Sequence, residues 1–144
     1  GAMATGWVNY NGTWYYLKNS GAMIASDWLY YNNNWYYLKD SGAMATGWVN
    51  YNGTWYYLKN SGAMIASDWL YYNNNWYYLK DSGAMATGWV NYNGTWYYLK
   101  DSGAMATGWV KDGGQWYYLA SSGKMLHNTY TPDGYYVDAS GAWK

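Results

Sequence analysis

The chain has 144 residues, with 13 Trp, 22 Tyr and no Phe, so every aromatic ring carries a polar atom and suits a half-buried position. Eight Lys balance eight Asp, and a neutral chain without Arg is poorly equipped to bind the phosphates of a nucleic acid. The absence of Cys excludes disulfides and thiolate metal sites, and with no long apolar run and no visible signal peptide we expect no membrane insertion.

Internal repetition decides how the chain is organised. Residues 1–41 recur identically as residues 42–82, and each block holds a repeat of 20 residues followed by one of 21 residues. Such verbatim duplication favours a designed or consensus sequence over a natural duplication. We predict a single domain over residues 1–144, made of repeats 1–20, 21–41, 42–61, 62–82, 83–102 and 103–122 and a degenerate terminal cap, 123–144.

Each repeat has the pattern of a β-hairpin. In the first, two short aromatic and β-branched runs, residues 7–10 and 13–17, flank Asn11-Gly12, the strongest short-range hairpin signal. The other repeats place Asn-Asn, Asn-Gly or Gly-Gly at the same point, and these residues also tolerate positive φ. A two-residue turn then predicts that Trp7 faces Tyr16 and that Asn9 faces Trp14.

Alternation along the strands predicts two different faces for each hairpin. One face carries Trp7, Trp14 and Tyr16, and the other carries Val8, Tyr10, Tyr15 and Leu17. Both faces are apolar, and a lone hairpin is barely stable in water, so consecutive hairpins should stack and bury one another. The cap, which has Tyr and Gly where the two Trp should be, should end such a stack.

Residues for catalysis or metal binding are sparse. The Asp residues lie in connectors, before a Trp, or in the atypical last two repeats, and we interpret them as solvated charge rather than as acid/base pairs. His127 is the only His and Pro132 the only Pro, and both have a structural interpretation in the cap. We therefore predict no catalytic site, no metal site and no cofactor.

The paired Trp residues are the specific signal. They recur as Trp-x6-Trp in six repeats and could serve simply as the hydrophobic glue of the stack, although Leu or Val would do this without exposing indoles. Repeated Trp pairs suit a sugar that stacks on an indole, or a quaternary ammonium attracted by the negative faces of several rings. Composition leaves both ligands open.

At Gly-Trp-x6-Trp-Tyr-Tyr-Leu the chain resembles the choline-binding repeats of pneumococcal surface proteins, autolysins and phage lysins. The resemblance covers the whole chain: GAMATGW and WYYL follow the family consensus, and DGYYVDASGAWK resembles a terminal repeat. It implies an all-β, solenoid-like left-handed superhelix of stacked β-hairpins that holds choline between consecutive repeats.

The resemblance also implies that the chain is a non-catalytic module at the bacterial cell-wall surface. Such a module recognises choline or phosphocholine of teichoic acids through many weak sites. Some members of the family form homodimers through terminal repeats, which makes a homodimer possible here. The alternative is a carbohydrate (glucan)-binding repeat module, although those repeats favour Tyr-Tyr-Phe and this chain has no Phe.

In the family, a site combines two Trp of one hairpin, a Tyr of the next hairpin and a Met of the connector. Carried over, the ligand-binding sets are Trp7, Trp14, Met23 and Tyr36; Trp28, Trp35, Met44 and Tyr56; Trp48, Trp55, Met64 and Tyr77; Trp69, Trp76, Met85 and Tyr97; Trp89, Trp96, Met105 and Tyr117; and Trp109, Trp116, Met125 and Tyr135. The first Tyr of each Tyr-Tyr pair is chosen because it lies on the face opposite its own Trp pair, and the second Tyr stays an alternative.

Overall fold

The computed structural model describes residues 3–144, which form two compact bodies. The N-terminal body comprises the described residues up to Asp68 together with Leu79–Ala84, and the C-terminal body comprises Trp69–Tyr78 and Met85–Lys144. Gly1 and Ala2, which begin the predicted repeat 1–20, lie outside the described residues. Whether the seven repeats fold as a single domain stays a prediction.

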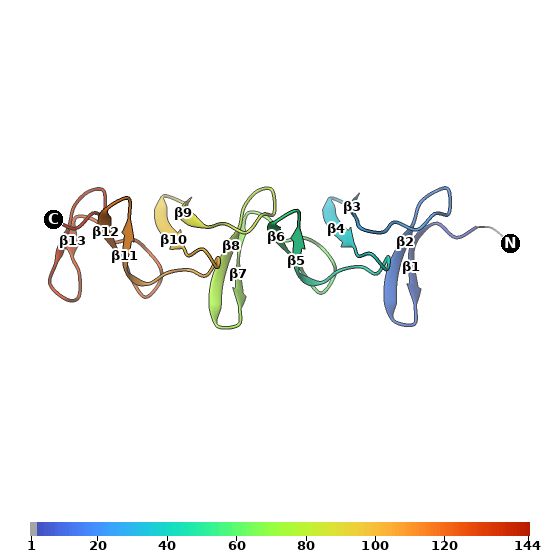
Figure 1. The fold of residues 1–144 in the computed structure, drawn as a ribbon, viewed down its shortest axis with the longest axis horizontal. Coiled ribbons are helices and arrows are strands. Elements are labelled where there is room, and N and C mark those ends of the chain that lie inside the picture. The colour runs from blue at the N-terminus through green and yellow to red at the C-terminus, as the bar shows by residue number, and fades with distance from the viewer. Residues whose placement is uncertain (1–2) are drawn as a thin grey trace. The chain divides into compact units, whose positions relative to one another are not determined.

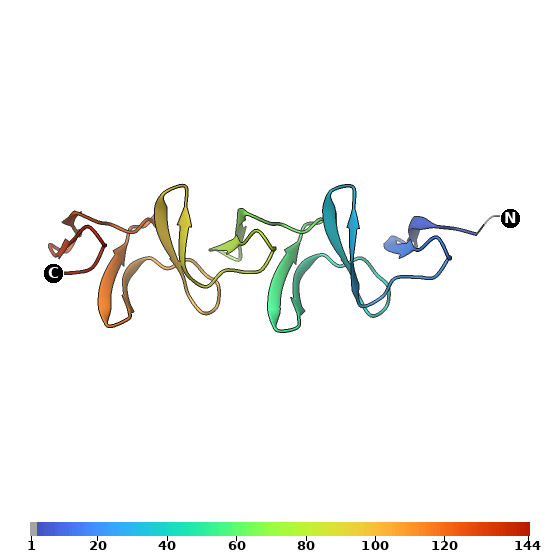
Figure 2. The same cartoon turned by 90° about the horizontal axis from the view of Figure 1, so that it is seen from above.

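Within each body the chain runs from hairpin to hairpin, and successive hairpins are turned relative to one another (Figures 1 and 2). Every sheet in residues 3–144 is a two-stranded hairpin, and the same residues contain no helix that could cross a membrane. The all-β stacked-hairpin fold is confirmed. The strands are β1 Gly6–Tyr10, β2 Thr13–Leu17, β3 Asp27–Tyr31, β4 Asn34–Leu38, β5 Gly47–Tyr51, β6 Thr54–Leu58, β7 Asp68–Tyr72, β8 Asn75–Leu79, β9 Gly88–Tyr92, β10 Thr95–Leu99, β11 Gly108–Asp112, β12 Gln115–Leu119, β13 Thr129–Tyr130 and β14 Tyr136–Val137.

The turns adopt the geometry that their residues predict. Asn11 has φ of 53° and Gly12 has φ of 81°, so both central residues of the β1–β2 turn are left-handed, as a type I′ turn requires. Trp7 pairs with Tyr16 and Asn9 with Trp14, which confirms the predicted register. The two Trp of a repeat therefore lie on one face of their hairpin.

The connectors join the hairpins through backbone hydrogen bonds. After β2, Met23 forms an isolated bridge with Leu17, which adds a short third segment to the hairpin. The connector after β4 reaches back further: the N–H of Met44 donates to the carbonyl of Trp14 at 2.8 Å. Hairpins β1–β2 and β3–β4 are thus tied together by backbone groups that would otherwise need water.

The buried core is aliphatic rather than aromatic. The Leu that ends the second strand is fully buried from the second repeat onward, and the cap places Val137 at the same point. Small residues of the connectors fill the remaining space; the buried residues are Leu38, Ala45, Leu58, Ala63, Leu79, Ala86, Leu99, Ala104, Ala106, Leu119, Val137 and Ala142. The hydrophobic glue of this fold is therefore Leu and Ala.

A methionine of each connector packs on a glycine of the next one. At Gly42, which has φ of 86°, an added Cβ would lie 2.4 Å from Sδ of Met23. The same contact recurs in the cap, where Met125 lies against Gly141. Glycine is needed here for its left-handed backbone and for the space that the sulfur occupies.

The longer repeats absorb their extra residue in the connector. Asp27 begins β3 and pairs with Leu38, as Gly6 pairs with Leu17 in the first repeat. The additional Ser26 takes φ of 56°, and its hydroxyl donates to the Asp40 carboxylate. The hairpin register is consequently the same in both kinds of repeat.

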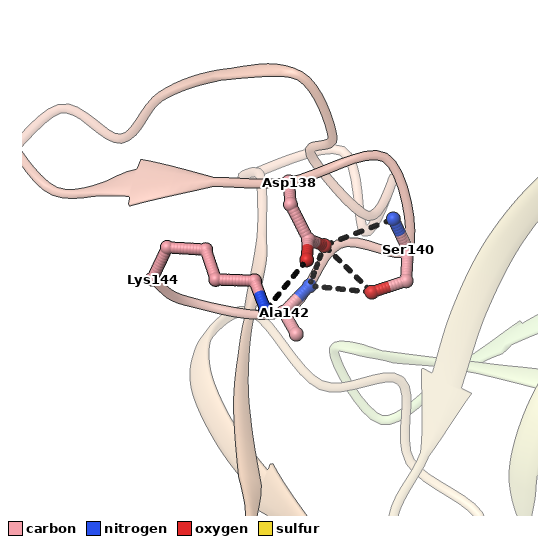
Figure 3. A network of polar contacts seen from close by, with 4 residues as sticks. All are labelled: Asp138, Ser140, Ala142 and Lys144. Atoms are coloured by element: carbon pink, nitrogen blue, oxygen red, sulfur yellow. Dashed lines mark hydrogen bonds and ion pairs between the residues drawn. The ribbon is translucent and has the colours of Figure 1, made fainter.

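The last turn is held by one carboxylate (Figure 3). Oδ1 of Asp138 accepts hydrogen bonds from the backbone N–H groups of Ser140 and Ala142 and from the Ser140 hydroxyl, and Lys144 lies 3.4 Å from Oδ2. The hydrogen bonds from Ser140 are the main reason that the pKa of Asp138 lies below its usual range. This network fixes the loop that presents Trp143.

Candidate aromatic pockets between hairpins

The first pocket lies between hairpins β1–β2 and β3–β4 and has a volume of about 340 Å³. The Trp7 and Trp14 rings lie 6.5 Å apart, with their planes at 85°. Tyr36 of the next hairpin approaches Trp7 to 5.1 Å between ring centroids. The lining residues are Trp7, Trp14, Tyr31, Tyr36, Met44 and Ser61.

The second pocket repeats this plan between β3–β4 and β5–β6, with a volume of about 260 Å³. Trp28 and Tyr56 approach to 5.1 Å. The lining residues are Trp28, Trp35, Tyr56, Met64 and Ser82. In both pockets the aromatic rings come from two consecutive hairpins, and the methionine comes from the connector that follows the second of them.

Equivalent ring contacts recur in the C-terminal body. The centroids of Trp69 and Tyr97 lie 5.0 Å apart, and the same distance separates Trp89 from Tyr117. Trp89 and Trp96 lie 6.4 Å apart at 87°. The structure therefore brings Trp69 to Tyr97, and Trp89 to Trp96 and Tyr117, while the function of these sets stays a prediction.

For the third predicted set, the rings of Trp48 and Trp55 lie 6.4 Å apart at 87° within the N-terminal body. Its Tyr77 belongs to the C-terminal body, so this set as a whole stays a prediction.

The methionines differ from the predicted sets by one connector. The first pocket is lined by Met44 instead of Met23, and the second by Met64 instead of Met44. The physical reason is the backbone bond from the N–H of Met44 to Trp14, which brings the connector beyond the second hairpin to the mouth of the first pocket. Met23 lines neither of these two pockets.

The same displacement holds in the C-terminal body. The N–H of Met105 donates to the carbonyl of Trp76, and the N–H of Met125 donates to the carbonyl of Trp96. The predicted sets had paired Trp76 with Met85 and Trp96 with Met105. Met85 itself packs on Gly103.

Sequence analysis also missed an aromatic residue at the end of each first strand. Tyr31 lies 6.2 Å from Trp7, and Tyr51 and Tyr92 take the equivalent place beside Trp28 and Trp69. The signal was available, because a Tyr precedes the turn in each of the first five repeats. The predicted alternation already put Tyr10 on the same face as Tyr15, the face that meets the preceding Trp pair.

The second Trp of each pair is half exposed. Trp14 and Trp35 each keep 43% of their surface accessible to solvent, while Leu38, in the same strand as Trp35, keeps none. An indole that served only as glue would be buried with the Leu residues. These rings are instead available to a ligand.

The terminal pocket, between β11–β12 and the cap, has a volume of about 390 Å³. Its lining residues are Trp109, Trp116, Asp133, Tyr135 and Trp143. Trp143 stands where a methionine was expected: its N–H donates to the carbonyl of Trp116 at 2.8 Å, as Met44 donates to Trp14. The predicted Met125 packs on Gly141. Aligning Ser-Gly-Ala-Trp143 with the Ser-Gly-Ala-Met of the other connectors would have identified this residue.

Two solvent-exposed aspartates also contact the pocket indoles, a contact that the sequence analysis did not predict. Oδ2 of Asp133 accepts a hydrogen bond of 2.9 Å from Nε1 of Trp109, and Oδ2 of Asp112 accepts one of 3.2 Å from Nε1 of Trp89. Hydrogen bonds from Thr131 and then from Trp109 lower the pKa of Asp133. Within residues 3–144 no cluster of His, Asp or Glu could hold a metal ion.

These features define a class of protein: an all-β repeat protein whose stacked hairpins form aromatic pockets at their joints. The chain matches the choline-binding repeat family over residues 28–69 and 86–130, more than half of its length. Residues 5–23 and 67–85 match a putative cell wall binding repeat. The chain belongs to the choline-binding repeat family.

Solved structures agree with this assignment. CbpJ of Streptococcus pneumoniae is 49% identical with a TM-score of 0.88, over 98% of this chain and 48% of that one. The choline-binding domain of CbpL from the same organism is 34% identical with a TM-score of 0.62, over 98% of this chain and 97% of that one.

The pneumococcal cell wall endolysin of phage Cp-1, solved in complex with choline, is 34% identical with a TM-score of 0.61, over 96% of this chain and 43% of that one. The chain thus spans about half the length of CbpJ and less than half of the endolysin. Comparison with curated proteins gives no match.

Proposed function

We propose that the chain is a non-catalytic module of the bacterial cell-wall surface that binds the choline groups of teichoic acids in the pockets between consecutive hairpins. The observation that supports it best is the separation of an aliphatic core from half-exposed Trp rings. The half-exposed Trp residues are not needed to form the hydrophobic core, and the Trp pairs surround spaces of a few hundred Å³. Phosphocholine would bind through the same trimethylammonium group.

The angles between the rings favour a quaternary ammonium over a sugar. A sugar stacks one flat face on one ring, whereas Trp7 and Trp14 meet at 85° and Tyr36 meets Trp7 at 66°. Rings that face one space from several directions suit a globular cation without hydrogen-bond donors. In the first pocket the polar groups are limited to the phenols, the indole N–H groups and Ser61, too few to satisfy a ring of hydroxyls.

The magnitude is that of a weak site. Each desolvated cation–π contact contributes on the order of 2 kcal/mol, and three rings give about 6 kcal/mol before the ligand's lost freedom is subtracted. A net value near 4 kcal/mol corresponds to a Kd of about 1 mM. Several such pockets on one polymer would gain affinity by avidity, which suits a module that anchors a protein to teichoic acid.

The test is a choline titration of the whole chain, followed by Trp fluorescence and by the midpoint of thermal unfolding. Choline should quench or shift the fluorescence and raise the midpoint, because it binds the folded chain alone. Trp14→Ala should remove one site. Tyr10→Ala is the matched control, since Tyr10 is 67% exposed and lines none of the pockets described above.

No response to 100 mM choline would contradict the proposal. Elution of the chain from a choline matrix by dextran rather than by free choline would instead establish the carbohydrate-binding alternative. Homodimer formation through terminal repeats stays a prediction, which the molar mass in solution with and without choline would decide.

A further inference from the structure

The joints of this chain differ not only in the connector residue that closes the pocket but also in the residue that lies beside the first Trp of each pair. In the β3–β4 hairpin this residue is Tyr31, which pairs with Asn34 and lies beside Trp7. In β11–β12 it is Asp112, which pairs with Gln115 and reaches Trp89. In the cap the turn residue Asp133 lies in the equivalent place, because it accepts from Nε1 of Trp109 as Asp112 accepts from Nε1 of Trp89. The same place is thus aromatic at the first joints and anionic at the last two.

Both carboxylate oxygens of Asp133 accept a hydrogen bond. Oδ1 accepts from the Thr131 hydroxyl and Oδ2 from the indole of Trp109. Thr131 is 4% exposed, and its hydroxyl also accepts the N–H of Tyr135, so it cannot easily turn away. A carboxylate has about four acceptor positions, and these contacts use two of them. Asp133 lines the terminal pocket with acceptor capacity to spare.

A quaternary ammonium cannot use that capacity, because its nitrogen carries no hydrogen. A protonated amine can, since each N–H donates to a carboxylate in a short, charge-assisted hydrogen bond. The first pocket discriminates in the opposite sense, because its polar groups are the phenols, the indole N–H groups and Ser61, and none of them is a charged acceptor for the N–H group of a protonated amine that the pocket desolvates.

We propose that Asp133 makes the terminal pocket selective for protonated amines bearing an N–H, whereas the first pocket prefers fully methylated ammonium groups. This inference rests on the proposed function, since it assumes that the pockets bind ammonium ions. It extends the ligand class of the module from choline to incompletely methylated aminoalcohols. Asp112 gives the joint at Trp89 the same character.

Lys111 must be taken into account, because its ammonium lies 5.9 Å from the centroid of the Trp116 ring. Its positive charge lowers the affinity of the terminal pocket for every cation, whatever the number of methyl groups. Asp133, by its negative charge, raises the affinity of the same pocket for every cation through electrostatic attraction. The directional hydrogen bond is therefore read from the ratio of two affinities, those of an N–H amine and of its N-methyl analogue, and not from either affinity alone.

The experiment compares choline with N,N-dimethylaminoethanol, which differs by one methyl group and is protonated at pH 7. Both are titrated into the ¹⁵N-labelled whole chain, and the indole N–H signals of Trp7 and Trp109 report on the first and the terminal pocket. Trp109→Phe and Trp7→Phe identify these signals. We expect the affinity ratio of the amine to choline to be about fivefold higher at Trp109 than at Trp7, a modest value because the carboxylate is solvated.

Three variants sharpen the comparison. Asp133→Asn should lower the ratio at the terminal pocket to that of the first pocket. Lys111→Gln should raise both affinities and leave the ratio unchanged. Tyr31→Asp copies into the first pocket the arrangement that Asp112 has beside Trp89, and it should raise the ratio there.

Equal ratios at the two pockets, or a ratio that Asp133→Asn does not change, would overturn the inference and leave the proposed function intact if choline still shifts Trp7. If neither ligand shifts either indole, both proposals fail. The amide spectrum of each variant shows whether it has folded, and Tyr31→Asp provides the gain of selectivity that no loss of folding can imitate.

Discussion

The first and the terminal pocket are built on the same backbone frame, yet different side chains complete them. In each, two Trp of one hairpin meet a Tyr of the next, and a connector N–H bonds to the carbonyl of the second Trp. Met44 completes the first pocket, while Trp143 and Asp133 complete the terminal one. The comparison teaches that the connector sets the position of a pocket and that single side chains set its chemistry.

If the frame is common, damage to it should affect both regions equally. Leu38→Ala in β4 and Leu119→Ala in β12 each remove a fully buried side chain. We expect each to lower the free energy of unfolding by about 2–5 kcal/mol, the usual range for a buried Leu. Denaturant unfolding measures this change. A cost for one variant several times that of the other would show that the two regions are not built on the same frame.

The methionine–glycine contact should be equally important at both ends. An added Cβ would lie 2.4 Å from Sδ of Met23 at Gly42 and 2.5 Å from Sδ of Met125 at Gly141. We expect Gly42→Ala and Gly141→Ala to cost about 1–3 kcal/mol, from the clash and from the positive φ together. Thermal unfolding gives the change.

Gly12→Ala is the control for that clash. Gly12 has φ of 81° with no atom within 4 Å of an added Cβ, so its substitution measures the backbone strain alone. Equal losses at Gly12 and Gly42 would mean that the sulfur contact contributes nothing.

Exchanging the residues that close the pockets should exchange their affinities for choline. Trp143→Met should weaken choline binding at the terminal pocket, and Met44→Trp should strengthen it at the first one. Trp143 is 45% exposed, so an effect of about 0.5–1 kcal/mol, or roughly twofold to fivefold, is expected. Titration of the indole signals of Trp109 and Trp7 measures both, and an unchanged affinity in Trp143→Met would remove Trp143 from the site.

Acid should loosen the terminal region before the first. The pKa of Asp138 is lowered in the folded chain, chiefly by Ser140, so its stabilising contribution is complete above the ordinary aspartate range and is lost as the pH falls through the folded-state pKa. Below about pH 4 we therefore expect faster hydrogen exchange, relative to its intrinsic rate, at the N–H of Trp143.

The N–H of Met44 is the internal control for acid loosening, because it makes the same bond at the first pocket. In the Asp138→Asn variant at pH 7, the N–H of Trp143 should exchange its hydrogen as fast, relative to its intrinsic rate, as it does in the parent chain at acid pH. Loss of protection at Met44 and Trp143 over the same pH range would show a global transition instead.

Local rules were enough for the hairpins. The Asn-Gly and Asn-Asn turns and the alternation of side chains predicted the register of β1–β2 without error, because a two-residue turn leaves one pairing available. The Trp pair and Tyr36 of the first pocket were predicted from the family resemblance, with alternation choosing the first Tyr of the pair, whereas Tyr31 was not predicted.

The closing residues did not follow from local rules. Met23 is nearer in sequence to the first hairpin than Met44, yet Met44 lies at its pocket because a connector hydrogen bond reaches across one whole repeat. The contact of Asp133 with Trp109 spans 24 positions and passes through an irregular cap. Such pairings depend on how one repeat is rotated on the next, which no short-range pattern encodes.

The sequence by itself therefore determined the repeat, the hairpin, its register and the face on which the Trp pairs lie, because turn chemistry and strand alternation act between near neighbours. The tertiary structure alone decided that Leu and Ala form the core and that Asp133 contacts Trp109 in the terminal pocket. Stacking buries whichever side chains meet at a joint, and that meeting is set by packing between repeats.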